Sequence, residues 1–250
     1  MGGSVQLEKN KRIGKIKFFH PKGNSLPSNL LYKLVQAFEK SEKDPDIKVI
    51  VLESKGNCFC TGASLKELER LKNIDDTTSF FMGFADLLNT IRKMSKFVLA
   101  KVHGKVVGGG VGLVAACDYA FATNAALIKL SELSIGLGPY VIEPAVSRKI
   151  GTTAFTQLSL DSAEWKSAQW GLENGLYAKC VTNKKDLDQT VINNAERLSN
   201  YDQQSLIHLR KLHWKDTNNW ESLLPKNAKI TAKLALSDFT QNKIKLLLNE

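Results

Sequence analysis

A run of glycines constrains this chain more than any other part of its sequence. Glycine occupies four of the five positions 108–112, between an apolar, strand-like segment at residues 97–102 and small apolar residues at 113–117. This order predicts a strand, a glycine turn and a buried helix. Glycine costs a helix roughly 1 kcal/mol relative to alanine, so the run indicates that something approaches the backbone closely. That group is either a ligand at the helix N-terminus, where N–H groups are unpaired, or a tightly packed neighbouring element.

A second segment, FCTGASLKEL at residues 59–68, follows another strand-like run at residues 49–53. Together with GKVVGGGVGLVAACDYAFAT at residues 104–123, it resembles the crotonase (enoyl-CoA hydratase/isomerase) superfamily. Members carry F-x-x-G-A-D-[LI]-K-E and, further along, G-x-x-x-G-G-G-x-E-L-x-x-x-C-D. The resemblance extends from about residue 13 to residue 180. Neither motif is decisive alone, but the spaced pair is specific.

The predicted fold class is α/β. Residues 13–19 and 47–52 read as strands, and residues 28–43 between them carry a helical stripe of apolar side chains. Such alternation favours a parallel sheet with crossover helices. The resemblance implies a crotonase-like spiral of ββα units over residues 1–195 and a C-terminal helical trimerisation region over residues 196–250.

Most of the remaining sequence reads as helical. Helices are predicted at residues 64–71 and 77–94, with a polar connection at residues 72–76 that is either a mobile lid or an ordinary linker. Beyond residue 141, the predicted helices are residues 145–150, 154–160, 163–171, 185–199, 202–214 and 227–248. The four tryptophans, Trp165, Trp170, Trp214 and Trp220, all lie in this part. We expect them to pack between helices or at subunit contacts.

The composition is that of an ordinary globular protein, with 43% apolar and 24% charged residues. No apolar run is as long as a membrane span, and residues 1–10 lack the apolar core of a signal peptide. The four cysteines lack zinc-site spacing, and we expect reduced thiols in a cytoplasmic protein without a metal. The net charge of +10 suits a nucleic acid or an anionic ligand such as coenzyme A. Because the lysines are scattered, the anionic ligand is favoured.

The resemblance assigns the backbone N–H groups of Ala63 and Gly109 to an oxyanion hole. Removing a proton beside a thioester carbonyl gives an enolate, whose negative charge gathers on oxygen. One preorganised N–H donor is typically worth about 3–4 kcal/mol to such an oxyanion. Because the donors are backbone atoms, the side chains at these positions need only be small, as Ala63 and Gly109 are.

The acid/base residues depart from the pattern of the family's hydratases. Those enzymes use two glutamates twenty residues apart, and the corresponding positions here are Gly112 and Glu132. A single carboxylate suits isomerisation, in which one base moves a proton from C2 to C4 of a 3-enoyl thioester. Several isomerases of the family keep only the later glutamate and lack the P-G-x-G-G run that follows it. This chain reads Pro139-Tyr140-Val141 there. Glu143 is a candidate second acid, or else a solvated helix residue.

The resemblance also implies how the substrate binds. Coenzyme A enters as part of an acyl-CoA thioester, and no separate cofactor is expected. Lys22 and Lys66 are candidates for contact with its phosphates, although either could be a solvated lysine. The predicted substrate-binding residues are Lys22, Cys60, Gly62, Ala63, Lys66, Gly108, Gly109, Gly112 and Pro139. The assembly implied is a homotrimer or a dimer of trimers.

Four functions are therefore open. The first is an enoyl-CoA isomerase with Glu132 as its single base. The second is a hydratase, decarboxylase or hydrolase of the same family, with water or another acid in place of a carboxylate at Gly112. The third is an RNA-binding protein, whose affinity would fall steeply with salt. The fourth is a structural trimer with little catalytic activity.

Overall fold

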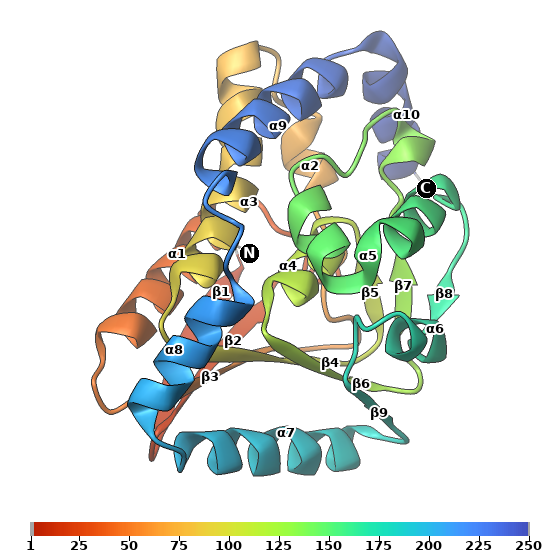
Figure 1. The fold of residues 1–250 in the computed structure, drawn as a ribbon. Coiled ribbons are helices and arrows are strands. Elements are labelled where there is room, and N and C mark those ends of the chain that lie inside the picture. Colours follow the sequence, from red (N-terminus) through yellow and green to blue (C-terminus); the bar gives the residue numbers. More distant parts are fainter. Residues whose placement is uncertain (1–2, 250) are drawn as a thin grey trace.

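The computed structural model describes residues 3–249, and its centre is a six-stranded sheet in the order β1-β2-β3-β4-β6-β9 (Figure 1). A three-stranded sheet, β5-β7-β8, lies beside it. The strands are β1 (Ser4–Asn10), β2 (Ile13–Phe19), β3 (Val49–Ser54), β4 (Phe97–Val102), β5 (Lys105–Val107), β6 (Tyr119–Thr123), β7 (Leu127–Lys129), β8 (Lys166–Ser167) and β9 (Lys179–Val181). Only the β1–β2 and β7–β8 pairs are antiparallel. The predicted α/β class with a parallel sheet is confirmed.

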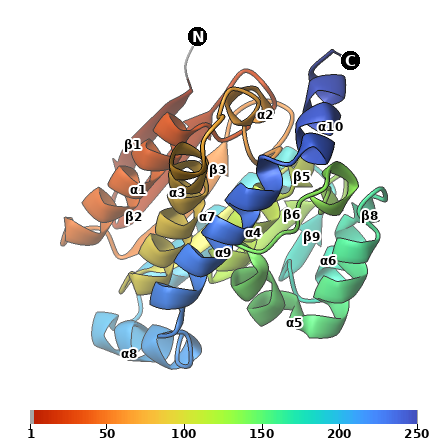
Figure 2. The ribbon, with the colours of Figure 1, turned by 90° about the horizontal axis from the view of Figure 1, so that it is seen from above.

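Helices cover both faces of the large sheet. They are α1 (Ser28–Lys43), α2 (Leu65–Leu68), α3 (Ile74–Lys93), α4 (Gly109–Ala116), α5 (Glu143–Leu160), α6 (Ala168–Glu173), α7 (Lys184–Ser199), α8 (Gln203–His213), α9 (Trp220–Ala235) and α10 (Asp238–Asn249). In Figure 1, α7 lies beneath the sheet, while α1, α3, α4 and α5 lie above it. Figure 2 shows α9 running alongside α3, against which it packs. No helix within residues 3–249 is both long and apolar enough to cross a membrane.

Strand β3 is buried along its whole length, and its first four residues are apolar. Val49 and Val51 pack in the smaller core beneath the sheet, with Leu187 and Val191 of α7. The alternate residues of β3 belong to the larger core above the sheet. Because successive side chains point to opposite faces, a strand covered on both sides has no solvent-facing positions. This double burial anchors the strand that leads into the FCTGASLKEL loop.

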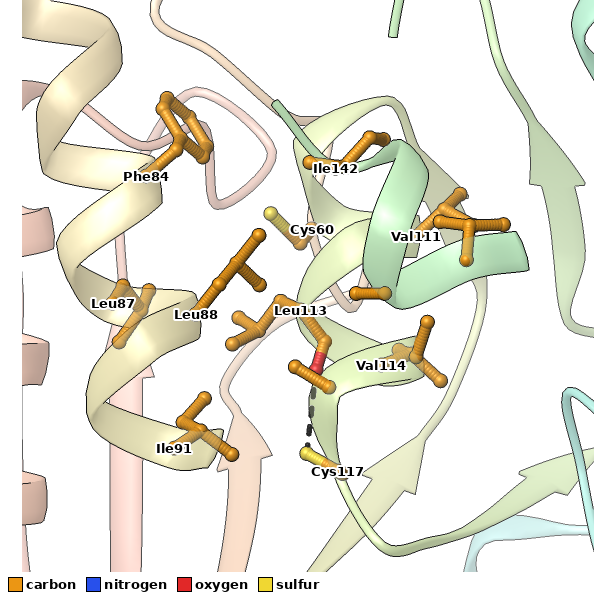
Figure 3. Packing of buried hydrophobic residues seen from close by; sticks show 14 of the residues in the cluster. Cys60, Phe84, Leu87, Leu88, Ile91, Val111, Leu113, Val114, Cys117 and Ile142 are labelled. Carbon is orange, nitrogen blue, oxygen red and sulfur yellow. Dashed lines mark hydrogen bonds between the residues drawn. The ribbon is translucent and has the colours of Figure 1, made fainter. Parts of the chain in front are cut away.

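The larger core joins α3 to the glycine-rich helix. Figure 3 shows Phe84, Leu88 and Ile91 of α3 together with Leu113 of α4 in this cluster. The side chains of α4 are small or apolar, and residues Gly110–Ala116 of this helix are all buried. The glycine run therefore places a short helix in the interior, with its N-terminus fixed by packing on two sides.

Several predicted boundaries are wrong, each for a local reason. The helix expected at residues 163–171 is instead the strand β8 followed by α6, which Ser167 caps by accepting a hydrogen bond from the N–H of Trp170. The helix expected at 227–248 is two helices, because Ser237 Oγ accepts from the N–H of Thr240 and starts α10. Helix α5 joins the helices predicted at residues 145–150 and 154–160 across a kink at Gly151, whose φ is +77°.

Other elements differ less from the prediction. The polar connection at residues 72–76 contains the N-cap of α3, where Asn73 Oδ1 accepts from the N–H of Asp76. Residues 185–199 and 202–214 correspond to α7 and α8. The predicted boundary between the spiral core and the C-terminal helical region, at residue 195, falls within α7. Among the tryptophans, Trp214 and Trp220 are buried and stack edge to face, as expected for helix packing, whereas Trp165 is 40% exposed.

A buried ion pair ties α8 to the sheet. Arg210 Nε lies 2.9 Å from Asp118 Oδ2, and the two side chains are 2% and 5% exposed. The guanidinium also donates to the carbonyls of Ile91, Arg92 and Met94 at the C-terminal end of α3. Asp118 also accepts from the N–H of Val98 and from Trp214 Nε1. The carboxylate and guanidinium therefore satisfy one another and four backbone groups, which is the condition under which a buried pair is tolerated.

Replacing Arg210 with methionine is expected to lower the free energy of unfolding by about 3–5 kcal/mol, because it leaves a buried carboxylate without its cation. Urea denaturation would measure this loss. Arg197→Met is the matched control, since Arg197 is exposed on α7 and should cost less than about 0.5 kcal/mol. Equal losses in the two variants would show that the Asp118 pair does not stabilise the fold.

Candidate active site

The FCTGASLKEL loop and the glycine run lie against each other. Isolated parallel bridges join Cys60 to Val106 and Leu26 to Ala63. Gly62 has a φ of +81°, and a Cβ at this position would lie 2.9 Å from Val107 O and 3.2 Å from Gly109 N. Only glycine adopts this backbone conformation and permits this approach. Glycine at position 62 therefore lets the two loops meet at their backbones.

Two backbone N–H groups at this junction are unpaired. Within residues 3–249, neither Ala63 N nor Gly109 N donates a hydrogen bond. Their neighbours do: Ser64 N donates to Leu26 O, and Gly108 N donates to Lys129 O. Gly109 is the first residue of α4, so its N–H is one of the orphan donors of a helix N-terminus. Two free donors from adjacent loops have the chemistry of an anion or oxyanion site.

Phe84 holds the N-terminus of α4 from the other side. A Cβ at Gly109 would lie 3.1 Å from Cδ1 and 3.2 Å from Cζ of Phe84, and closer still to Cε1. The ring belongs to α3 and is 5% exposed. Any side chain at position 109 would therefore displace either the ring or the helix terminus that carries the free N–H.

Glu132 lies directly over the glycine run. It precedes a short 3-10 helix at Leu133–Ile135, and its carbonyl accepts from the N–H groups of Ile135 and Leu137. A Cβ at Gly108 would lie 2.8 Å from Glu132 Oε1. The carboxylate therefore rests on the Cα of Gly108, the residue that precedes the free N–H of Gly109. Glycine at position 108, with a φ of +53°, makes room for it.

The carboxylate of Glu132 is buried and poorly compensated. Its Oε2 has no hydrogen-bond partner within residues 3–249. Burial raises the pKa of Glu132 from 4.5 to about 7, with a small opposing effect from its own backbone N–H. A carboxylate with this pKa is well suited to accept and return a proton near neutral pH. A perturbed pKa in a cavity is also a typical mark of a functional site.

Glu132, Ala63 and Gly109 line one cavity of about 330 Å³. Glu132 is the only carboxylate among the described residues that line it. Most of the other lining side chains are apolar: Ala63, Leu65, Leu68, Phe81, Phe84, Val107, Ile135, Leu137, Pro139, Val141, Ile142, Trp165 and Leu247. The cavity therefore combines one acid with a wall suited to a hydrocarbon chain.

A larger groove of about 1280 Å³ adjoins this cavity and shares Thr61, Ala63, Leu65 and Leu247 with it. Four exposed cations line the groove: Lys22, Lys66, Arg70 and Lys245. Lys245 comes from α10, far along the chain from the others. Glu67 and Glu69 also line the groove, but Glu67 is engaged in capping α1 through both Ser28 N and Ser28 Oγ. The groove is thus suited to an anionic ligand whose other end reaches the cavity.

The predicted site residues separate into three groups. The cavity is lined by Gly62, Ala63, Gly108, Gly109, Glu132 and Pro139, and the groove by Lys22, Ala63 and Lys66. Cys60 and Gly112 line neither and are fully buried, so their positions do not support direct substrate contact. Cys60 instead supports the loop, since its Sγ accepts from the N–H of Gly62, and burial raises the pKa of this thiol to about 12.

Other residues differ from what their sequence position suggested. Glu143 is half-buried at the start of α5 and does not line the cavity. Ser64 caps α2 by accepting from the N–H of Glu67. Sequence reasoning missed Phe84, Ile142, Lys245 and Leu247. Of these, only Ile142 lay beside a segment already singled out, the one after Glu132.

Comparisons with known proteins found relatives that match most of this chain. The model of the family described as enoyl-CoA hydratase/isomerase matches residues 8–248. Enoyl-CoA hydratase, mitochondrial, from Pongo abelii is 30% identical over 236 residues, which cover 94% of this chain and 79% of the relative. A probable enoyl-CoA hydratase from Bacillus subtilis is 25% identical, covering 84% and 81%. The mouse mitochondrial Delta(3,5)-Delta(2,4)-dienoyl-CoA isomerase is 29% identical, covering 72% of this chain and 59% of the relative.

Solved structures resemble the whole chain. The enoyl-CoA hydratase of Bacillus halodurans superposes with a TM-score of 0.89 at 20% identity, covering 97% of this chain and 99% of that one. An enoyl-CoA hydratase of Mycobacterium avium superposes with a TM-score of 0.87 at 24% identity, covering 98% and 96%. Because both sequence identities are below 25%, the structural similarity establishes the fold alone.

Proposed function

Since this chain belongs to the enoyl-CoA hydratase/isomerase family, we propose that it isomerises a 3-enoyl-CoA thioester to the 2-enoyl form with Glu132 as its single base. The crotonase-like α/β fold predicted from the motifs is confirmed by the family match and the solved structures. One observation carries the choice of reaction. Glu132 is the only carboxylate among the described residues that line the cavity, and the position of the hydratases' other glutamate is Gly112.

The proposed mechanism uses the two free N–H groups and the buried carboxylate. The thioester carbonyl binds between Ala63 N and Gly109 N, and ionised Glu132 takes a proton from C2. The electrons of that C–H bond form a dienolate whose oxygen is stabilised by both donors. Glu132 then gives the proton to C4, so the double bond moves from C3–C4 to C2–C3. No atom is gained or lost, and the carboxylate returns to its ionised form.

The neighbouring groove supports coenzyme A as the carrier. Ala63 lines both the groove and the apolar cavity, so a thioester held at Ala63 could place its acyl chain in the cavity and its phosphates beside the cations of the groove. The names of the mitochondrial hydratase and the dienoyl isomerase described above both specify a CoA thioester as the substrate. Acyl-CoA is therefore the proposed substrate, with no cofactor of its own. Within residues 3–249, no cluster of three or more His, Cys, Asp or Glu is placed to hold a metal ion.

A hydratase is the second candidate function, because several relatives are named as hydratases. Incubating the protein with 3-enoyl-CoA and 2-enoyl-CoA of equal chain length separates the two. Single-base isomerisation predicts fast conversion of the 3-enoyl substrate and little hydration of the 2-enoyl substrate. Hydration at a comparable rate would overturn the proposal and favour the hydratase.

The pH dependence of the reaction follows from Glu132. Only the ionised carboxylate can take the C2 proton, and burial raises its pKa to about 7. We therefore expect kcat/KM to fall tenfold per pH unit below about 7 and to level off above it. Steady-state assays across this range would show it. A midpoint near 4.5, the ordinary pKa of a glutamate, would mean that the essential base is not this buried carboxylate.

The cations of the groove should affect binding rather than chemistry. Replacing both Lys22 and Lys66 with alanine is expected to raise KM for an acyl-CoA about 10–30-fold, at roughly 1 kcal/mol each, with kcat unchanged. The matching pantetheine thioester, which lacks the nucleotide phosphates, should show no change. Lys211→Ala is the control, since Lys211 is exposed on α8. An equal rise in KM for both thioesters would show that these lysines do not bind the nucleotide.

The exposed apolar side chains of the C-terminal helices support the proposed trimer. Phe239 and Leu246 of α10 and Leu212 of α8 are each about 59–60% exposed. Large apolar side chains that are this exposed are available for contact with another subunit. RNA binding has weaker support, because the cations of the groove already lie beside the proposed thioester site.

A further inference from the structure

The side chain of Ile142 fills the space above Gly112. A Cβ at position 112 would lie 2.5 Å from Ile142 Cβ, and closer still to its Cγ2. Non-bonded carbon atoms pack at about 3.5–4.0 Å, so the two side chains cannot coexist in this backbone. Ile142 is 4% exposed and lines the cavity that contains Glu132. Figure 3 shows it in the core cluster that includes Cys60 and Phe84.

Gly112 lies one helical turn beyond Gly108, the N-cap of α4, and its N–H donates to Gly108 O. The carboxylate of Glu132 rests on Gly108 and Ile142 rests on Gly112. Ile142 lines the cavity that contains Glu132, so a carboxylate at position 112 would enter that cavity in the volume that Ile142 occupies.

The backbone holds Ile142 firmly in this place. Ile142 is the N-cap of α5, and its carbonyl accepts from the N–H of Val146. The N–H of Glu143 donates to Pro139 O, which closes the preceding turn, and Pro144 follows in the first turn of the helix. The Cβ of Ile142 therefore cannot move away without unwinding the start of α5.

From this packing we infer that Ile142 determines which reaction the cavity supports, by excluding both a second acid and a reactive water from the wall beside Glu132. The inference rests on the proposed function and extends it. Hydration forms a C–O bond between water and C3 and places a proton on C2, so it needs a held water molecule and two proton-transferring groups. A buried water needs two to four polar partners, and Ile142 provides none. Glu132 is therefore the only carboxylic acid among the described lining residues from which the dienolate can receive its proton.

The test uses the fact that the clash involves the Cβ of Ile142 as well as its outer atoms. In Gly112→Glu/Ile142→Gly the clash is removed, whereas Gly112→Glu/Ile142→Ala retains the Cβ that lies 2.5 Å away and serves as the matched control. Assays with 2-enoyl-CoA should show hydration increased on the order of 10²-fold over wild type in the glycine double variant. The alanine double variant and Ile142→Gly alone should show little increase. Isomerisation, which depends on Glu132, should persist in the glycine double variant.

Thermal unfolding tests the packing without relying on activity. Gly112→Glu should lower Tm strongly, and adding Ile142→Gly should restore much of the loss, so the two effects are not additive. Gly112→Glu combined with Ile16→Ala, a truncation of a fully buried isoleucine in β2, should be additive. Additive losses in the glycine double variant would overturn the steric inference.

Two outcomes separate this inference from the proposed function. If wild type isomerises 3-enoyl-CoA but the folded glycine double variant hydrates no faster than Ile142→Gly, the inference fails and the proposed function stands. If wild type hydrates 2-enoyl-CoA readily, with Ile142 in place, the proposed function and the exclusion of water both fail.

Discussion

Replacing Glu132 with glutamine is expected to lower kcat for isomerisation by about 10³–10⁴-fold, with little change in KM. A positioned general acid or base typically contributes 10²–10⁴-fold. Here one carboxylate would perform both proton transfers, since it is the only acid among the described residues that line the cavity. Glutamine keeps the size of the side chain but cannot accept the C2 proton. Steady-state kinetics with a 3-enoyl-CoA would measure the loss.

Glu143→Gln is the control, because Glu143 lies outside the cavity lining and should keep activity near that of wild type. A large loss in this variant would revive Glu143 as a second acid. Retention of isomerase activity by Glu132→Gln would contradict the single-base mechanism outright.

Unfolding measurements on Glu132→Gln show whether the variant is intact. The folded protein holds a proton on Glu132 up to about pH 7, whereas the unfolded chain releases it near pH 4.5. Wild type should therefore lose stability as pH rises from 4.5 to 7, by up to about 3 kcal/mol, because a buried charge forms. Glutamine removes this loss, so the variant should be the more stable protein at pH 8. A lower kcat in a variant whose free energy of unfolding is higher than that of wild type excludes misfolding as the cause of the lost activity.

The second large effect is expected at Gly109. Gly109→Ala should lower kcat by about 10²–10³-fold, the cost of losing one oxyanion donor. The added methyl group collides with the ring of Phe84 and displaces the N-terminus of α4, whose N–H is otherwise free to bind the enolate oxygen. Because Glu132 is untouched, the midpoint of the pH profile should stay near 7.

Removing the colliding ring should rescue this variant. In Gly109→Ala/Phe84→Ala the methyl group has room, so kcat should return to within about tenfold of that of Phe84→Ala alone. Gly83→Ala is the glycine control, since Gly83 lies in α3 without a positive φ, does not line the cavity, and a Cβ there would meet only the side chain of Leu31, and kcat should not change. A Gly109→Ala enzyme with full activity would show that this N–H group does not stabilise the transition state.

The sequence predicted the parts of the site that depend on backbone conformation. Gly62 and Gly108 are glycines because their φ angles are positive and another backbone or a carboxylate lies against them. Such demands leave a visible mark in the sequence, as does the spacing from Gly112 to Glu132. The parallel sheet could be predicted for a similar reason, since burial on both faces makes the first four residues of β3 apolar.

The remaining features depend on contacts between distant segments. Ile142 and Gly112 are thirty residues apart, and nothing local indicates that one side chain fills the place of the other. Lys245 and Leu247 reach the site because α10 packs against the turn after Glu132, where Phe239 lies over Gly136. The helix predicted at residues 227–248 has continuous helical periodicity, and only the cap at Ser237 divides it.

Transfer of a labelled proton tests the central claim most directly. A 3-enoyl-CoA carrying deuterium at both C2 positions would be converted in ordinary water in a single turnover, and the product examined by mass spectrometry and NMR. The carboxylate of Glu132 is buried and its Oε2 has no partner within the described chain, so exchange with solvent should be incomplete. The single-base mechanism with Glu132 predicts deuterium at C4 of the 2-enoyl product. A product whose new C4 hydrogen comes entirely from solvent would contradict it.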